Sequence, residues 1–164
     1  MTRGPARLEF LATRSDAAPA SELFARLDAL FDAQYAHLGR ASRPGSVTTP
    51  EEMAPPHGAF LLGVLDGVPV AIGGLRRLDD RTCEIKRLYV EPPARSAGVG
   101  RRLLAALEDA ARALGYGCAR VDTGPAQRHS RALFRATGYR VIPRYNDNHV
   151  AVWFAEKDLG DRTG

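Results

Sequence analysis

The spacing of apolar and polar positions predicts an alternation of strands and helices along the chain. Short apolar or alternating stretches bounded by turn residues predict strands over residues 7–13, 60–65, 68–75, 82–90, 119–122, 139–142 and 150–154. Apolar residues at helical spacing predict helices over residues 21–38, 99–114 and 130–137. This order predicts a mixed α/β sheet with helices on its faces.

Turn residues support these boundaries. The dipeptide Asp66-Gly67 favours a tight hairpin turn between two strands, and Gly115 and Gly138 stand where two of the helices should end. Residues 41–58 are rich in Pro, Gly, Ser and Thr, which predicts a loop with a short helical turn at 49–53. In the first helix the predicted apolar stripe consists of Leu23, Leu27, Leu30, Phe31 and Leu38.

Length and composition place these elements in one domain. The chain has 164 residues and is 45% hydrophobic, which is enough for a single core over residues 1–164, with 1–5 and 160–164 as loose tails. No stretch approaches the roughly 20 apolar residues of a membrane span, and the amino terminus has no secretory pattern. Cys83 and Cys118 lack metal-ligand spacing, so we expect buried thiols, no metal site and a cytoplasmic protein.

The charge pattern argues against a nucleic-acid partner. The formal net charge is +4, and the basic residues, almost all arginines, are spread along the whole chain. A nucleic-acid binder usually gathers its positive charge on one face. Mild positive charge also suits a polyanionic cofactor, because it raises the local concentration of such a ligand.

The segment with the clearest chemistry is the turn from Arg95 to Gly100, which has the form Arg-x-x-Gly-x-Gly and opens a predicted helix. Backbone N–H groups at a helix amino terminus bind phosphate, and Gly98 and Gly100 let it approach closely. A dinucleotide fingerprint would need a third glycine where Arg102-Leu103 stands, and the Gly-Lys-Ser/Thr of a Walker loop is absent.

The run CEIKRLYVEPPARSAGVGRRLLAALEDAARALGY resembles the acetyl-CoA-binding motif of the GNAT superfamily of N-acetyltransferases, and the later run ALFRATGYRVIP extends the resemblance. The resemblance implies the GNAT fold, a mixed, mostly antiparallel sheet of about seven strands flanked by about four helices. It also implies acetyl-CoA as cofactor.

The resemblance further implies a bulged strand that splays from its neighbour and pairs with the pantetheine arm. The amide of Leu88 would stabilise the oxyanion of the transition state, and main-chain groups of the turn would hold the pyrophosphate. The implied cofactor residues are Leu88, Tyr89, Val90, Arg95, Ser96, Ala97, Gly98, Val99, Gly100, Arg101, Gln127 and Phe134.

Acetyl transfer to an amine also needs groups that accept and donate protons. Glu84 matches the family position of a general base, and an ion pair with Lys86 is the alternative explanation. Strand alternation places Glu84, Lys86 and Leu88 on one face unless a bulge intervenes. Phe134 stands where many members carry a tyrosine acid, so the thiolate would take its proton from water or the ammonium, with Tyr145 as a substitute acid.

These features predict an N-acetyltransferase that acts on the primary amine of a small metabolite such as an amino acid. Lys86 and Arg87, with Arg76 and Arg77 on the adjoining strand, would hold a carboxylate of the substrate, and Tyr145 would line the acceptor site. A protein or peptide acetyltransferase and a non-catalytic acyl-CoA-binding module stay as alternatives. We expect no membrane partner, and a homodimer through an edge strand at 150–154 is left open.

Overall fold

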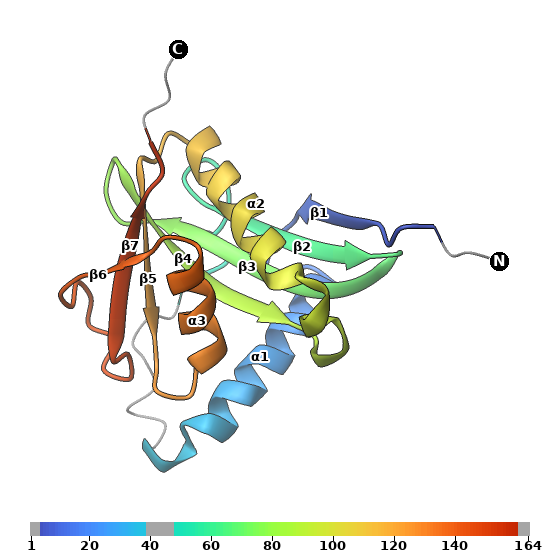
Figure 1. Cartoon of the computed structure of the whole chain (residues 1–164), viewed down its shortest axis with the longest axis horizontal. Helices are drawn as coiled ribbons and strands as arrows, with labels where there is room; N and C mark the ends of the chain where they lie inside the picture. Colours follow the sequence, from blue (N-terminus) through green and yellow to red (C-terminus); the bar gives the residue numbers. More distant parts are fainter. Residues whose placement is uncertain (1–3, 39–47, 161–164) are drawn as a thin grey trace.

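The computed structural model describes residues 4–38 and 48–160, which form one seven-stranded sheet in the order β1-β2-β3-β4-β5-β7-β6 (Figure 1). Its strands are β1 Leu8–Ala12, β2 Ala59–Leu65, β3 Val68–Arg77, β4 Thr82–Val90, β5 Cys118–Thr123, β6 Arg140–Val141 and β7 Trp153–Asp158. The pair β4–β5 is parallel, and the other five pairs of the sheet are antiparallel. The mixed, mostly antiparallel sheet expected from the sequence is therefore confirmed.

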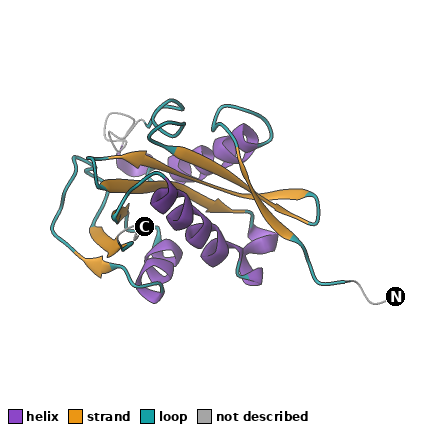
Figure 2. Cartoon of the chain, turned by 90° about the horizontal axis from the view of Figure 1, so that it is seen from above, coloured by secondary structure: helices purple, strands orange, loops and turns teal. Residues whose placement is uncertain are grey.

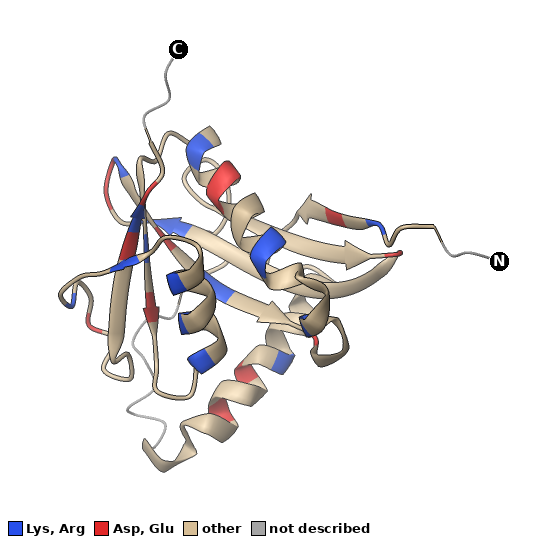
Figure 3. Ribbon diagram, viewed as in Figure 1, with Lys and Arg blue, Asp and Glu red and all other residues tan. Residues whose placement is uncertain are grey.

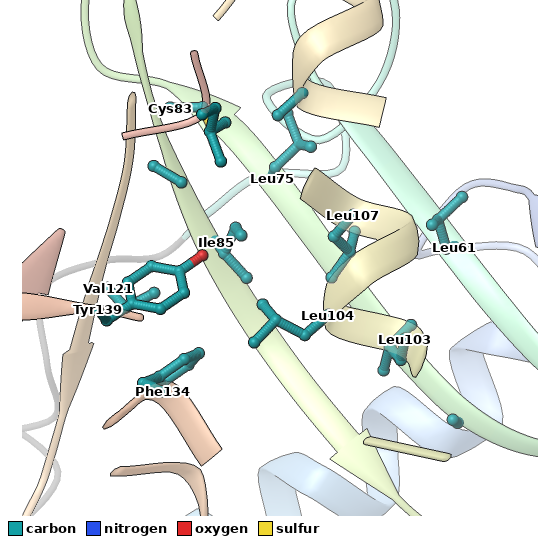
Figure 4. Close-up of a cluster of buried hydrophobic side chains, with 14 of the residues drawn as sticks. Leu61, Leu75, Cys83, Ile85, Leu103, Leu104, Leu107, Val121, Phe134 and Tyr139 are labelled. Carbon is teal, nitrogen blue, oxygen red and sulfur yellow. The ribbon is translucent and has the colours of Figure 1, made fainter. Parts of the chain in front are cut away.

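Helices cover both faces of this sheet (Figure 2). The helical segments of the described chain are α1 Ala20–Gln34, α2 Val99–Ala113, α3 Arg128–Ala136 and the 3-10 segments η1 Ala36–Leu38 and η3 Pro92–Ala97. Helix α2 buries Leu103, Leu104 and Leu107 completely against Leu75 and Ile85 of the sheet (Figure 4). Each such leucine contributes about 1.5–3 kcal/mol through burial.

Helix α1 packs on the opposite face through a smaller apolar cluster. Its Leu23 joins Met53, Phe60, Leu62 and Ile72, all of which are at most 5% exposed. The two faces can therefore be told apart by their cores, with α2 and α3 on one side and α1 on the other (Figure 1).

A bulge interrupts β4 in its middle. Gly74 of β3 pairs with Lys86 and Ile72 pairs with Tyr89, so β4 has one residue more than β3 between these pairs. Arg87 lies in the bulge with a φ of 62°. The expected bulge is present, and it places Leu88 toward α2, because a Cβ on Gly73 would lie 2.7 Å from Leu107 and 3.2 Å from Leu88. Simple alternation, which put Leu88 on the face of Lys86, is wrong for this reason.

Strands β4 and β5 stay together over a short distance and then separate (Figure 1). Their parallel pairing runs from Thr82 opposite Cys118 to Glu84 opposite Arg120. Beyond Glu84 the edge of β4 that faces β5 has no strand partner in the sheet. The splayed pair that the family resemblance implies is thus confirmed.

Three local expectations need correction. Helix α1 ends at Gln34, and Leu30 and Leu38 of the expected stripe are 37% and 39% exposed. Residues 50–53 form turns within the loop predicted there, and residues 41–47 lie outside the described part of the chain. The last strand begins at Trp153, because the N–H groups of Val150 and Ala151 are bound by Asn148 in a turn. This strand, β7, lies between β5 and β6, so it is not the edge strand expected for a dimer.

None of the helices in residues 4–38 and 48–160 is long and apolar enough to cross a membrane. Cys83 is buried, Cys118 is partly exposed, and both are free thiols. Lys and Arg residues are distributed over several helices and strands (Figure 3). The cytoplasmic location stays a prediction.

Candidate active site

A cavity of about 270 Å³ lies where β4 and β5 separate. Four elements contribute to it: α1, the bulged part of β4, the end of β5 and α3. The lining residues are Phe24, Asp28, Phe31, Tyr35, Thr48, Ile85, Lys86, Arg87, Leu88, Asp122, Thr123, Gly124, Gln127, Ser130, Phe134, Asn148 and Val150. Because these residues come from both faces of the sheet, the cavity passes through the gap between the two strands.

The two ends of the cavity differ in charge. On the side of α2 and α3 it is lined by uncharged residues such as Leu88, Gln127 and Phe134. The charged side chains among the described lining residues all come from the α1 side, and these are Asp28, Lys86, Arg87 and Asp122. We call the first part the neutral half and the second part the charged half.

The Arg-x-x-Gly-x-Gly turn leads into the amino terminus of α2 on the neutral side. Gly98 directly precedes α2 and has a φ of 70°. No side chain caps this end of the helix, and the first turn of α2 holds no acidic residue. Arg95 is fastened nearby by a 2.9 Å bond from its Nε to the carbonyl oxygen of Val90. An uncapped helix start without carboxylates attracts an anion through its N–H groups and dipole.

Gly98 and Gly100 are glycines for different reasons. At Gly98 the left-handed φ requires glycine, and a Cβ there would meet nothing within 4 Å. Gly100 has no left-handed φ, and its Cβ would make only ordinary contacts of 3.7 Å with Leu133 and Val90. The chain itself therefore does not need glycine at position 100, whereas a phosphate group that approaches the backbone closely would.

The free edge of β4 provides the second part of a cofactor cradle. In the described part of the chain no strand pairs with this edge at residues 88–90, so the backbone there can bind an extended amide-containing group in the manner of an added strand. The side chain of Tyr89 donates to Glu91 Oε2 over 3.1 Å and so does not obstruct the edge. The turn and the edge together fit the pyrophosphate and pantetheine parts of coenzyme A.

Phe134 of α3 and Gln127, which precedes this helix, line the neutral half. Phe134 is 3% exposed and stacks on Trp153 with ring centroids 6.3 Å apart. Gln127 lies in the cavity wall and accepts a 2.6 Å hydrogen bond from the backbone N–H of Gly124. Both therefore have rigid positions beside the free edge of β4.

Glu84 lies behind the cavity in a dense polar network. Its side chain is 0% exposed, and its Oε1 lies 2.9 Å from Arg76 Nε and 3.2 Å from Lys86 Nζ. Its Oε2 accepts hydrogen bonds from the Tyr145 hydroxyl at 2.6 Å and from the Asn146 amide at 3.1 Å. Burial alone would raise the pKa of Glu84, but Lys86, Tyr145 and Arg76 together hold this pKa below its usual value.

The network brings together three residues predicted separately for the substrate site. Lys86 lines the cavity, whereas Arg76 and Tyr145 do not and instead contact Glu84 from behind it. Arg76 also donates to Glu52 over 3.3 Å. Burial and the adjacent Glu84 raise the pKa of Tyr145 far above its usual value, so its hydroxyl keeps its proton at neutral pH.

Asp122 is a site residue that the sequence analysis did not find. Its Oδ2 accepts hydrogen bonds from Asn146 at 2.7 Å and from Asn148 at 3.1 Å, and it lines the cavity. Asn146 bonds Glu84 as well, so it links the two carboxylates. The available signal was the position of Asp122 at the carboxyl end of a strand parallel to β4, where ligands commonly bind in such sheets.

Comparison with known proteins agrees with this geometry. The sequence model of the acetyltransferase (GNAT) family matches residues 24–139. That match covers most of the chain and includes the bulged strand, the turn and α3. The chain belongs to the GNAT family of acetyltransferases.

Individual proteins similar to this chain share between 19% and 36% of its residues over the aligned parts. An IAA acetyltransferase of Azospirillum brasilense is 36% identical over 90 residues, which span 54% of this chain and 59% of that protein. The structure of a putative acyl-CoA N-acyltransferase from Klebsiella pneumoniae superposes with a TM-score of 0.73, at 26% identity over 93% of this chain and 98% of the other. A putative acetyltransferase from Salmonella typhimurium, solved with acetyl-CoA, gives a TM-score of 0.65 at 19% identity over 98% of both chains.

Proposed function

We propose that this protein transfers the acetyl group of acetyl-CoA to the primary amine of a small metabolite such as an amino acid. The observation that supports this function best is the cavity between β4 and β5, which joins an uncharged half beside the phosphate-binding turn to a charged half on the α1 side. Two substrates that enter from opposite faces of the sheet would meet in this gap. A volume of about 270 Å³ suits a small acceptor better than a folded protein segment.

The neutral half would bind and orient the cofactor. Main-chain N–H groups from Arg95 to Arg101 would hold the pyrophosphate, and the free edge from Leu88 to Val90 would hold the pantetheine arm. Acetyl-CoA supplies the activated thioester that the amine attacks. The amide of Leu88, at the bulge, would donate to the carbonyl oxygen on which negative charge develops.

A neutral amine is needed for the attack, so a group in the charged half must receive its proton. Asp122 is the carboxylate best placed for this role, because it lines the cavity and its orientation is fixed by Asn146 and Asn148. Glu84, predicted as the base from the family motif, stays the second candidate. Its burial and its four donors favour a role in holding Lys86, Tyr145 and Asn146 in place.

The departing thiolate has no tyrosine beside it at position 134. Phe134 lines the neutral half, and the hydroxyl of Tyr145 is already bonded to Glu84. A thiol has a pKa near 8.5, so water or the ammonium product can protonate the thiolate without a dedicated acid. We therefore propose that neither position 134 nor Tyr145 supplies a tyrosine general acid.

Release of free thiol from acetyl-CoA over a panel of amines tests this function directly. Gly98→Glu places a carboxylate where the pyrophosphate binds, and we expect it to reduce thiol release by more than about 100-fold. Gly115→Glu is the matched control, because Gly115 is also exposed, has a φ of 95° and has nothing within 4 Å of a Cβ, but lies at the other end of α2. Equal rates for the two variants, or no acetyl-CoA binding by the wild type, would contradict the proposal.

A further inference from the structure

The charged half of the cavity contains an arginine with an unusual setting. The guanidinium carbon of Arg87 lies 5.4 Å from the ring centroid of Phe24 and 5.9 Å from that of Phe31, both on α1. Its Nη1 lies 3.9 Å from Asp28 Oδ1, and its side chain is 19% exposed. The two aromatic rings stabilise the guanidinium at the cavity wall through cation–π contacts.

Arg87 has a strained backbone conformation, and this conformation directs its side chain to the cavity wall beside α1. Its φ of 62° lies in the left-handed region, which residues other than glycine rarely adopt. In a regular strand the residue after Lys86 would point to the α2 face, but the bulge turns Arg87 toward α1. A strained residue beside a cavity is typical of functional positions.

The other cations on this face are held by the network behind the cavity. Lys86 and Arg76 both pair with the buried Glu84 at 3.2 Å and 2.9 Å. Arg87 lies 3.9 Å from Asp28, whose side chain is 44% exposed. A ligand carboxylate inside the cavity would compete with this long, solvated ion pair.

We infer that Arg87 binds a carboxylate of the acceptor and thereby selects amino acids over simple amines; this inference rests on the proposed acetyl transfer. A planar guanidinium matches a carboxylate in two parallel hydrogen bonds. Because Phe24 and Phe31 already hold the group, little conformational freedom is lost on binding. Asp122 lies on the opposite strand of the gap, so the two charges suit the two ends of an amino acid.

The test compares L-amino acids with their carboxamides as acceptors, by the rate of thiol release from acetyl-CoA. We expect the wild type to prefer the acids, and Arg87→Gln to lower kcat/KM for acids by roughly 100-fold while it changes the rate for carboxamides little. Arg87→Lys should restore part of the preference for acids over carboxamides, since lysine keeps the positive charge but cannot make the two parallel hydrogen bonds of a guanidinium. Arg135→Gln is the matched control, because Arg135 also stacks on a ring, that of Trp153 at 5.8 Å, but does not line the cavity.

A second variant gives an effect of opposite sign. Asp28→Asn removes the competing carboxylate, so KM for amino acids should fall by roughly three-fold. The assignment is overturned if the wild type acetylates carboxamides as well as acids, if Arg87→Gln slows both equally, or if Asp28→Asn leaves KM unchanged or higher. If no amine releases thiol from acetyl-CoA with the wild type, the proposed transfer itself fails and this assignment falls with it.

Discussion

The neutral and charged halves of the cavity are built in different ways. The neutral half and the cofactor cradle beside it depend largely on one continuous stretch, the edge of β4 after Glu84 and the turn at Gly98, and Gln127 and Phe134 join them from α3 and its loop. The charged half combines single residues from α1, β4, β5 and the loop before β7. Local sequence therefore defines the first half, whereas long-range packing assembles the second.

This difference corresponds to what each half has to recognise. The neutral half and its cradle would bind the cofactor mainly through backbone groups, which do not require particular side chains. The charged half offers Arg87, Asp28 and Asp122, whose charges distinguish one acceptor from another. Substitutions in the two halves should therefore separate cofactor binding from acceptor recognition.

The largest effect should come from Glu84, which supports the charged half from behind. Glu84→Gln puts two amide donors where four donors now converge, and it leaves the cations of Arg76 and Lys86 without their buried partner. We expect a loss of about 3–5 kcal/mol in the free energy of unfolding, measured with denaturant. Glu52→Gln removes the half-exposed partner of Arg76 and should cost less than about 1 kcal/mol.

The same carboxylate predicts a pH dependence. Its pKa is lowered on folding, so its contribution to stability is complete above the ordinary value of 4.5 and is lost as the pH falls through the lowered pKa. Unfolding of the wild type followed from pH 7 to pH 3 should show this loss, and Glu84→Gln should lack it. Parallel curves for the two proteins would show that folding does not lower the pKa of Glu84.

The next largest effect should come from Asp122 and should concern catalysis. Asp122→Asn keeps an oxygen acceptor for Asn146 and Asn148 but cannot take a proton. We expect kcat/KM for the acceptor to fall by roughly 100-fold at pH 7, with acetyl-CoA affinity unchanged. If the loss shrinks at a pH where the amine is already neutral, Asp122 is the proton acceptor. An active Asp122→Asn variant would return that role to Glu84.

The smallest effect should come from the neutral half and should have opposite signs in two measurements. Gly100→Ala adds a methyl group that makes only ordinary contacts, so it should stabilise the first turn of α2 by about 0.5–1 kcal/mol. The same methyl group should reduce acetyl-CoA affinity by roughly 10-fold, because it obstructs close approach of the pyrophosphate. Unchanged affinity in a calorimetric titration would remove Gly100 from the cofactor site.

Particular elements show how far the sequence could be interpreted. The strand Thr82–Val90 and the start of α2 at Val99 were predicted with the bounds that the structure shows, because hydrophobic periodicity and glycine turns are local signals. The last strand was misplaced, because Val150 and Ala151 are apolar but their N–H groups are held in a turn by Asn148. A local pattern cannot report that a side chain or carbonyl nearby has taken a ladder hydrogen bond.

The sequence by itself determined the class of fold, the glycine turn before α2 and the segment that we propose holds the cofactor. These features depend on residues close together in the chain, where turn geometry and periodicity act. The tertiary structure alone decided that Glu84 is enclosed by Tyr145 and Asn146, that Asp122 faces the cavity, and that Arg87 points to α1. The partners in the first two cases are 24 to 62 residues apart, and the third depends on one extra residue in a strand, so three-dimensional packing had to place these charges.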